Sequence, residues 1–183
     1  MAFLGVIKAL RGSVGAERIG TLVAQWGDEL RTALARRIDK GEWYPYAAFA
    51  QLLAGADAEI GDGKGSLCVE LGHAAAKNDL SGGAFAVLRM LASPRHLIGS
   101  CERVWPRYYR DAGRMEAVST LPERTVLRIH DFPTMAPEHC RMMEGWMISA
   151  MSILGATVMP GARESRCTSL GAPYHEFTCA WSR

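Results

Sequence analysis

Apolar residues recur at three- and four-residue steps in the first part of the chain. The longest such stretch predicts one amphipathic helix from about Glu17 to Ile38. Gly41 follows this stretch, as expected where a helix ends. Pro45 then opens a second predicted helix, because proline suits the first helical turn.

Three more helical segments are predicted before the pattern changes. Residues 67–77 and 84–92 show helical apolar spacing and are separated by a glycine pair. Pro94 opens the next helix, which we expect to extend to about Asp111. Pro106 lies inside this stretch and predicts a kink or a break, because proline removes a backbone donor.

The final third has a mixed pattern. The β-prone segments are 115–120, 125–132, 156–163 and 175–181. Between the second and third of them, residues 137–154 predict a strong helix that ends before a glycine. Pro160 indicates an edge strand or a bulge, because proline cannot donate to a sheet ladder. The order β-β-α-β-β after a helical part predicts an α+β fold, with the helices packed on a small antiparallel sheet.

Length and composition are compatible with one ordinary globular domain. The chain has 183 residues, of which 49% are apolar and 22% charged. We therefore expect a single domain over residues 1–183, with a mainly helical part (1–112) and a β-β-α-β-β part (113–183).

Charge and hydropathy argue against several partners. The formal net charge of +2 gives no support for nucleic acid or an anionic membrane surface. Lys8 and Arg11 interrupt the apolar N-terminal run, which argues against a signal peptide. No stretch approaches the roughly 20 apolar residues of a membrane span. We expect a cytoplasmic protein, and its odd number of five cysteines favours thiols or metal ligands over disulfides.

Four potential metal ligands fall in the final third of the chain. Cys140 lies in the first turn of the predicted helix, Glu164 and Cys167 form Glu-x-x-Cys, and His175 starts the last strand. Zinc favours four-coordinate sites with such ligands. The alternatives are buried structural cysteines and a solvated glutamate. Cys179 lies on the same strand face as His175 and could replace His175 or Glu164, or belong to the core.

These residues carry a resemblance to a known family. The stretch from about Tyr108 to Trp181 resembles the 4-vinyl-reductase domain, a superfamily related in fold to haem nitric-oxide-binding domains and TRAPP subunits. Its phenol-sensing members bind zinc through Cys, Glu-x-x-Cys and Cys. The resemblance implies that Cys140, Glu164, Cys167 and His175 hold a closed, structural zinc, with histidine where that family has cysteine.

The resemblance also implies an apolar ligand pocket between the helices and the sheet. The candidate ligand-binding residues are Trp105, Tyr108, Tyr109, Met143, Trp146 and Met147. Their alternative role is plain core packing. A catalytic metal would need a nearby base, for which His130 and His139 are the candidates, and we expect His139 to face solvent. The Tyr-x-Ser-x-Arg motif of haem-binding members is absent, which argues against haem.

The sequence therefore predicts a non-catalytic small-molecule-binding sensor or regulatory domain with a structural zinc and an apolar pocket. Its partners are expected to be a small apolar or aromatic molecule and a protein partner or a second copy of the chain. Two alternatives stay open. One is a protein-interaction module that dimerises through its helical half. The other is an enzyme of tetrapyrrole metabolism.

Overall fold

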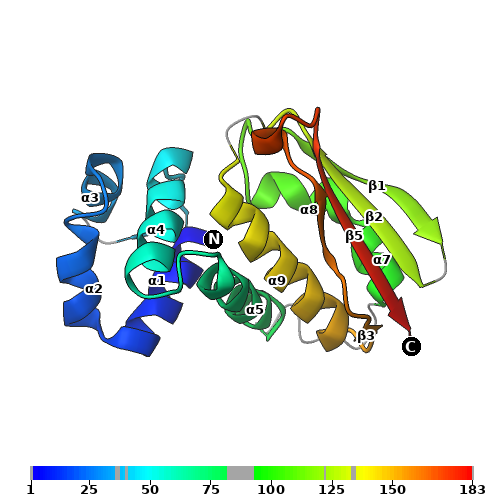
Figure 1. The fold of residues 1–183 in the computed structure, drawn as a ribbon, viewed down its shortest axis with the longest axis horizontal. Helices are drawn as coiled ribbons and strands as arrows, with labels where there is room; N and C mark the ends of the chain where they lie inside the picture. Colours follow the sequence, from blue (N-terminus) through cyan, green and yellow to red (C-terminus); the bar gives the residue numbers. More distant parts are fainter. Residues whose placement is uncertain are drawn as a thin grey trace.

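The computed structural model describes residues 2–35, 38–39, 41–81, 93–121, 123–132 and 135–182. A group of helices lies on one side and a sheet on the other, with α5 (Ser66–Ser81) and α9 (Pro137–Ile153) between them (Figure 1). The fold class predicted from the sequence, α+β with an antiparallel sheet, is confirmed. None of the helices in the described ranges is long and apolar enough to cross a membrane.

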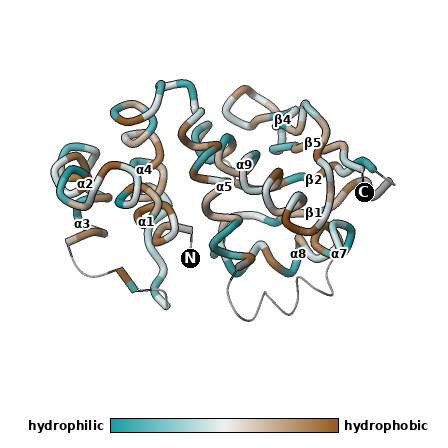
Figure 2. The backbone as a smooth tube through the Cα atoms, turned by 90° about the horizontal axis from the view of Figure 1, so that it is seen from below, coloured by the Kyte–Doolittle hydropathy of each residue, from teal (hydrophilic) through white to brown (hydrophobic). Residues whose placement is uncertain are grey.

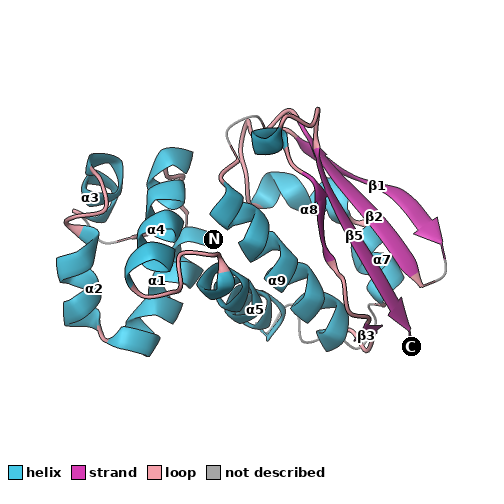
Figure 3. Ribbon diagram, in the orientation of Figure 1, coloured by secondary structure: helices cyan, strands magenta, loops and turns pink. Residues whose placement is uncertain are grey.

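The elements follow the predicted order of helices and then strands (Figure 3). The helices of the first part are α1 (Ala2–Val14), α2 (Ala16–Val23), α3 (Asp28–Leu34) and α4 (Tyr46–Glu59). After α5 come α7 (Pro94–Gly99), α8 (Cys101–Val104) and the 3₁₀ helix η1 (Trp105–Arg107). The strands are β1 (Arg114–Leu121), β2 (Arg124–His130), β3 (Thr157–Val158), β4 (Arg163–Arg166) and β5 (His175–Ser182), with the 3₁₀ helix η2 (Thr168–Leu170) before β5.

The sheet has the order β1-β2-β5-β3, and β4 also pairs with β5. All pairs are antiparallel, and the register places Leu127 opposite Phe177 and Ile129 opposite His175. These four side chains are buried because alternate residues of a strand point to the same face. In Figure 2, α7 and α8 lie beside β1, and α9 lies between α5 and the strands, where it contacts β3 and β4. Helices therefore cover one face of the sheet.

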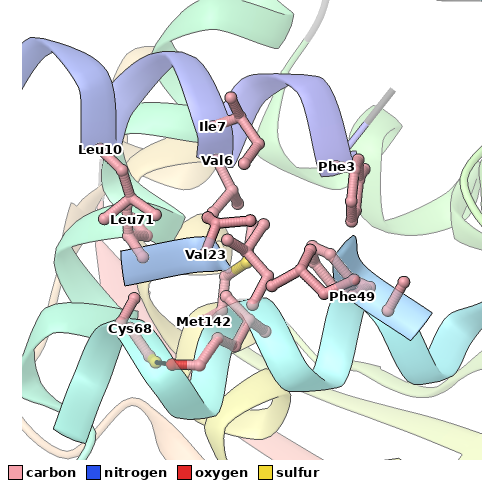
Figure 4. Packing of buried hydrophobic residues seen from close by; sticks show 14 of the residues in the cluster. Phe3, Val6, Ile7, Leu10, Val23, Phe49, Cys68, Leu71 and Met142 are labelled. Carbon is pink, nitrogen blue, oxygen red and sulfur yellow. Dashed lines mark hydrogen bonds between the residues drawn. The ribbon is translucent and has the colours of Figure 1, made fainter. Parts of the chain in front are cut away.

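The helical part has its own apolar core. Phe3, Val6, Ile7 and Leu10 recur at helical spacing on α1, and all four are buried. Figure 4 shows them packed towards the side chains of the neighbouring helices, including Phe49 of α4. Helix α1 was not predicted from the sequence, although its apolar spacing is the signal that identifies a helix.

Helices α5 and α9 touch through their backbones. A Cβ atom added at Gly72 would come within 3.0 Å of the Met142 carbonyl oxygen, and one added at Gly145 would come as close to the Val69 carbonyl. Only glycine allows two helices to approach in this way. This contact joins the helical part to the part that carries the sheet.

One helix predicted from the sequence is wrong, and another lies outside the described residues. The single helix predicted over 17–38 is wrong, because α2 ends at Val23 and α3 begins at Asp28. Gly27 between them has a φ of 141°, a conformation that interrupts any helix. The helix predicted over 84–92 lies outside the described residues. The break predicted at Pro106 is confirmed, since the chain there forms η1.

The predicted strand over 156–163 is divided into β3 and β4. Pro160 and Gly161 lie between them, and Gly161 has a φ of 99°. Both short strands pair with β5 on the side away from β2. The proline thus falls at the edge of the sheet, as expected for a residue without a backbone donor.

Candidate functional site

A cavity of about 90 Å³ lies between helices α5, α7 to η1 and α9 and the inner face of the sheet. The six residues predicted to bind a ligand, Trp105, Tyr108, Tyr109, Met143, Trp146 and Met147, all line it. Most other described lining side chains are aliphatic or contain sulfur, among them Leu97, Ile98, Cys101, Met115, Leu127, Met142, Met151 and Cys179. The structure therefore brings the predicted residues together around one apolar space.

His139 lies at the wall of this cavity and was placed wrongly from the sequence. It was expected to face solvent, but its side chain is fully buried. The Tyr46 hydroxyl lies 3.1 Å from Nδ1 of His139, and the Tyr109 hydroxyl lies 2.6 Å from Nε2. The Tyr46 hydroxyl also accepts a hydrogen bond from the backbone N–H of Ala136. Two tyrosines therefore replace the water that a buried imidazole needs.

The side chains of His139, Tyr46 and Tyr109 have more donor hydrogen atoms than there are hydrogen bonds between them. A neutral imidazole has one N–H, and the Tyr46 and Tyr109 hydroxyls have one O–H each. Two hydrogen bonds join the three side chains, so one hydroxyl hydrogen is left over. Tyr109 lines the cavity, so this group places a polar side chain in the mostly apolar wall.

Asp79 is the second polar feature of the wall. Its Oδ2 atom accepts a hydrogen bond of 2.9 Å from the Tyr108 hydroxyl and one of 3.0 Å from Nε1 of Trp146. Among the described residues that line the cavity, Asp79 is the only acid, and no lysine or arginine is present. Asp79 was not predicted from the sequence, because a carboxylate near the end of a helix usually faces solvent.

Burial sets the charge state of the titratable groups around the cavity. It lowers the pKa of His139 to about 3, with a further contribution from His175. Burial also raises the pKa values of the Cys101 and Cys179 thiols and raises the pKa of Tyr109 well above 10.0. At neutral pH these side chains are uncharged, so they provide neither a thiolate nucleophile nor an imidazolium acid.

The four predicted metal ligands also lie close together, near the N-terminal end of α9. One potential ligand atom from each of Cys140, Glu164, Cys167 and His175 lies within 4.8 Å of the others. Nδ1 of His175 is 2.7 Å from Oε1 of Glu164 and 3.5 Å from Sγ of Cys140. We call these four residues the Cys-Glu-His cluster. It joins the start of α9 to β4 and β5.

The surroundings of the cluster hold its histidine in one orientation. Nε2 of His175 lies 2.7 Å from Oγ1 of Thr168 and 3.4 Å from the Phe132 carbonyl oxygen. In metal sites the second ring nitrogen of a ligand histidine commonly has such partners. Burial and the nearby Glu164 raise the pKa of the Cys140 thiol. Cys179, the alternative ligand, lies on the cavity wall and outside this group.

Solved structures share this fold across the whole chain. No family model and no curated protein sequence matches the chain. An H-NOX protein from S. oneidensis in the Fe(II) ligation state has a TM-score of 0.76 and 12% identity over 100% of this chain and 95% of that chain. The Fe(II) unliganded H-NOX protein from K. algicida has a TM-score of 0.74, 12% identity and the same coverages. The S. oneidensis H-NOX domain in the Fe(II)CO state has a TM-score of 0.73 and 10% identity over 100% and 97%.

These matches correct two expectations. The chain is similar in fold to H-NOX proteins, so the resemblance to the zinc-containing phenol-sensor type of 4-vinyl-reductase domain is wrong. The prediction of structural zinc as the cofactor is also wrong, because the matching structures are described with Fe(II), and a further one with haem. At 10–12% identity the matches establish the fold alone.

A haem group does not fit the cavity as the described residues shape it. The volume of about 90 Å³ is well below the roughly 300–1,000 Å³ of pockets for drug-sized ligands. His139 is the one imidazole among the described lining residues, and tyrosine hydroxyls occupy both of its nitrogens. Haem carries two propionate carboxylates, and the described lining offers them the negative Asp79 and no cation. The described residues therefore do not form a haem site.

Proposed function

We propose that this chain is a non-catalytic, small-molecule-binding domain of the sensor type that takes a small apolar guest in its internal cavity. The observation that carries the proposal is the cavity itself, which lies between α5, α7 to η1, α9 and the sheet and is lined mostly by aliphatic, aromatic and sulfur-containing side chains. Ligand sites are mostly apolar spaces with a few placed polar groups, and this wall has that composition.

The small volume of the cavity and the flexible methionine side chains in its wall favour small guests. An engineered apolar cavity of about 150 Å³ stays dry and binds benzene or xenon. The cavity of about 90 Å³ is smaller, but five methionines, Met115, Met142, Met143, Met147 and Met151, line it. Methionine side chains adapt to irregular guests because they are unbranched and polarizable. The neutral state of His139 and the thiols supports binding over catalysis.

Xenon tests this proposal without any assumption about the natural ligand. Ala75 is buried and lines the cavity, so Ala75→Leu should fill the space from α5. Ala74 is its neighbour on the same helix and does not line the cavity, so Ala74→Leu is the matched control. We expect saturable xenon binding, followed by NMR, in the parent and in Ala74→Leu but not in Ala75→Leu. Absence of xenon binding from the parent, or its persistence in Ala75→Leu, would contradict the proposal.

We also propose that the Cys-Glu-His cluster binds a transition-metal ion. Two thiols, an imidazole and a carboxylate are donors that such ions accept, and the four ligand atoms already lie within 4.8 Å of one another. Cys140 and His175 are almost completely buried, so a thiolate there needs a positive partner. The partners of Nε2 of His175 support the same reading, because they leave Nδ1 directed at the cluster.

Elemental analysis of the purified protein tests the cluster. We expect about one equivalent of a first-row transition metal per chain in the parent, and its loss in Cys167→Ser. Cys179→Ser is the matched control, since Cys179 is also a buried thiol of the C-terminal part but lies on the cavity wall. Equal metal content in the parent and in Cys167→Ser would refute ligation by Cys167.

A single domain over residues 1–183 is part of the same proposal. The backbone contact between α5 and α9 at Gly72 and Gly145 joins the two parts directly. Met142 of α9 belongs to the apolar core of the helical part, and it also lines the cavity. One cooperative unfolding transition, seen alike by far-UV circular dichroism and tryptophan fluorescence, is the expected result.

A further inference from the structure

The described part of the cavity wall carries a negative charge and no positive one. Asp79 is the only charged side chain among the described lining residues, and the other described titratable groups there are histidine, tyrosine and cysteine. The two hydrogen bonds that other described residues donate to Asp79 come from uncharged groups, the Tyr108 hydroxyl and the Trp146 indole. A carboxylate at the border of an apolar space is costly unless an opposite charge pairs with it.

The helix that carries Asp79 strengthens the negative potential at this point. Asp79 lies in the last turn of α5, which ends at Ser81. The carbonyl groups at the C-terminal end of a helix have a partial negative charge, and cations are favoured there. The last turn of α5 contains no basic residue. A cation placed next to Asp79 inside the cavity would therefore interact favourably with the carboxylate and with the helix end.

Aromatic rings surround the same part of the cavity. The ring centroids of Tyr108 and Trp146 are 6.3 Å apart, those of Tyr108 and Tyr109 are 6.4 Å apart, and those of Tyr109 and Trp105 are 4.3 Å apart. All four rings line the cavity. Aromatic walls bind ammonium groups because the faces of the rings are negative. The carboxylate and the rings thus favour the same kind of ligand group.

From this arrangement we propose that the ligand of the cavity is a small alkylamine, bound with its ammonium group at Asp79 and its apolar body among the methionines. This inference rests on the proposed function, since it names the class of guest that the cavity takes. The ammonium donates to the Asp79 carboxylate, and the Tyr108 and Trp146 donors hold that carboxylate in place. The volume of about 90 Å³ limits the apolar body to a few carbon atoms unless the methionines move.

Three probes with nearly the same carbon skeleton separate charge from shape. Isobutylamine is an ammonium at neutral pH, because alkylamines have a pKa near that of lysine, about 10.4. Isobutanol is neutral, and isobutyrate is an anion. Dissociation constants are measured for each by NMR titration of the full chain. We expect isobutylamine to bind the parent about tenfold or more tighter than isobutanol, as a charge-assisted hydrogen bond implies, and isobutyrate to bind weakest.

Asp79→Asn then tests the residue. The asparagine keeps an oxygen that can accept from Tyr108 and Trp146 but removes the charge, so the preference for isobutylamine over isobutanol should fall about tenfold. Glu70→Gln is the matched control, because Glu70 is an exposed acid on the same helix and does not line the cavity. It should keep the preference of the parent.

The outcomes distinguish this inference from the proposed function. If the parent binds xenon and isobutanol but shows no preference for isobutylamine, the cavity is a binding site and the amine inference is wrong. The inference is also overturned if the preference survives Asp79→Asn. If neither xenon nor any probe enters the parent, the proposed function itself fails. Should Asp79→Asn not fold, the comparison of the three probes on the parent decides the matter alone.

Discussion

Replacement of Gly145 by alanine is the most direct test of how the two parts of the molecule meet. The added Cβ would come within 3.0 Å of the backbone carbonyl of Val69, a distance that real Cβ atoms essentially never show. Gly72 on the facing helix is equally close to the Met142 carbonyl. Because the obstacle is the backbone of a helix, a change of rotamer cannot relieve the clash. Helices α5 and α9 would have to move apart.

The expected cost follows from two opposing effects. Overpacking of a tightly packed interface costs about 1–3 kcal/mol, occasionally more. Alanine in place of glycine inside a helix raises the free energy of unfolding by about 1 kcal/mol, because alanine has the higher helix propensity. A clash with backbone belongs at the upper end of the first range, so we expect Gly145→Ala to lower the free energy of unfolding by about 2 kcal/mol. In a chain of this size such a loss lowers the Tm by about 4–8 °C.

Urea unfolding followed by circular dichroism measures this change. Gly20→Ala is the matched control, because Gly20 lies inside α2 with nothing within 4 Å of an added Cβ. It should stabilise the protein by up to about 1 kcal/mol. Gly72→Ala combined with Gly145→Ala should cost less than the sum of the single changes, since one opening of the interface accommodates both. A Gly145→Ala protein as stable as the parent would refute the close approach of α5 and α9.

Three further predictions concern Tyr109, Leu52 and Leu170. Burial raises the pKa of Tyr109 well above 10.0, so above that pH the folded state keeps a proton that the unfolded state releases, and stability falls as pH rises. Tyr109→Phe should make this loss smaller, measured as the shift of the urea midpoint between about pH 9 and about pH 11. Leu52 is fully buried, and Leu52→Ala should cost about 2–5 kcal/mol. Leu170, which is 88% exposed, should tolerate alanine within about 0.5 kcal/mol.

Local signals in the sequence predicted most of the elements and missed where some of them break. The hairpin of β1 and β2 and helix α9 appear where alternation and helical spacing placed them, because those patterns are local. The helix predicted over 17–38 was wrong because apolar spacing continues across Gly27 while the backbone there does not stay helical. Gly27 followed by Asp28 was the available signal for a new helix start.

The residues of the site were less predictable, because their roles depend on contacts between distant segments. Tyr46 lies 93 positions from His139, and no sequence pattern connects them. The position of Asp79 similarly depends on Tyr108, which follows η1, and on Trp146 of α9. The lining aromatics and methionines could be proposed in advance because their chemistry suits an apolar space. The polar residues could not, since the half-buried carboxylate of Asp79 and the buried imidazole of His139 are recognised only by their partners.

The cavity and the Cys-Glu-His cluster share two elements. Helix α9 carries Cys140 into the cluster and Met143 and Met147 into the cavity wall, and β5 carries His175 into the cluster and Cys179 into the same wall.

Sγ of Cys140 and Nδ1 of His175 lie 3.5 Å apart where α9 meets β5, and His139, the neighbour of Cys140, lines the cavity. A guest that pushes this end of α9 away from β5 would lengthen that distance. Coupling between two binding sites is reciprocal, so a metal ion that holds Cys140 and His175 together should change the affinity for a guest by the same factor by which the guest changes metal affinity. A measurement of isobutylamine affinity with and without metal gives that factor directly. Equal isobutylamine affinities with and without the metal would contradict coupling between the two sites.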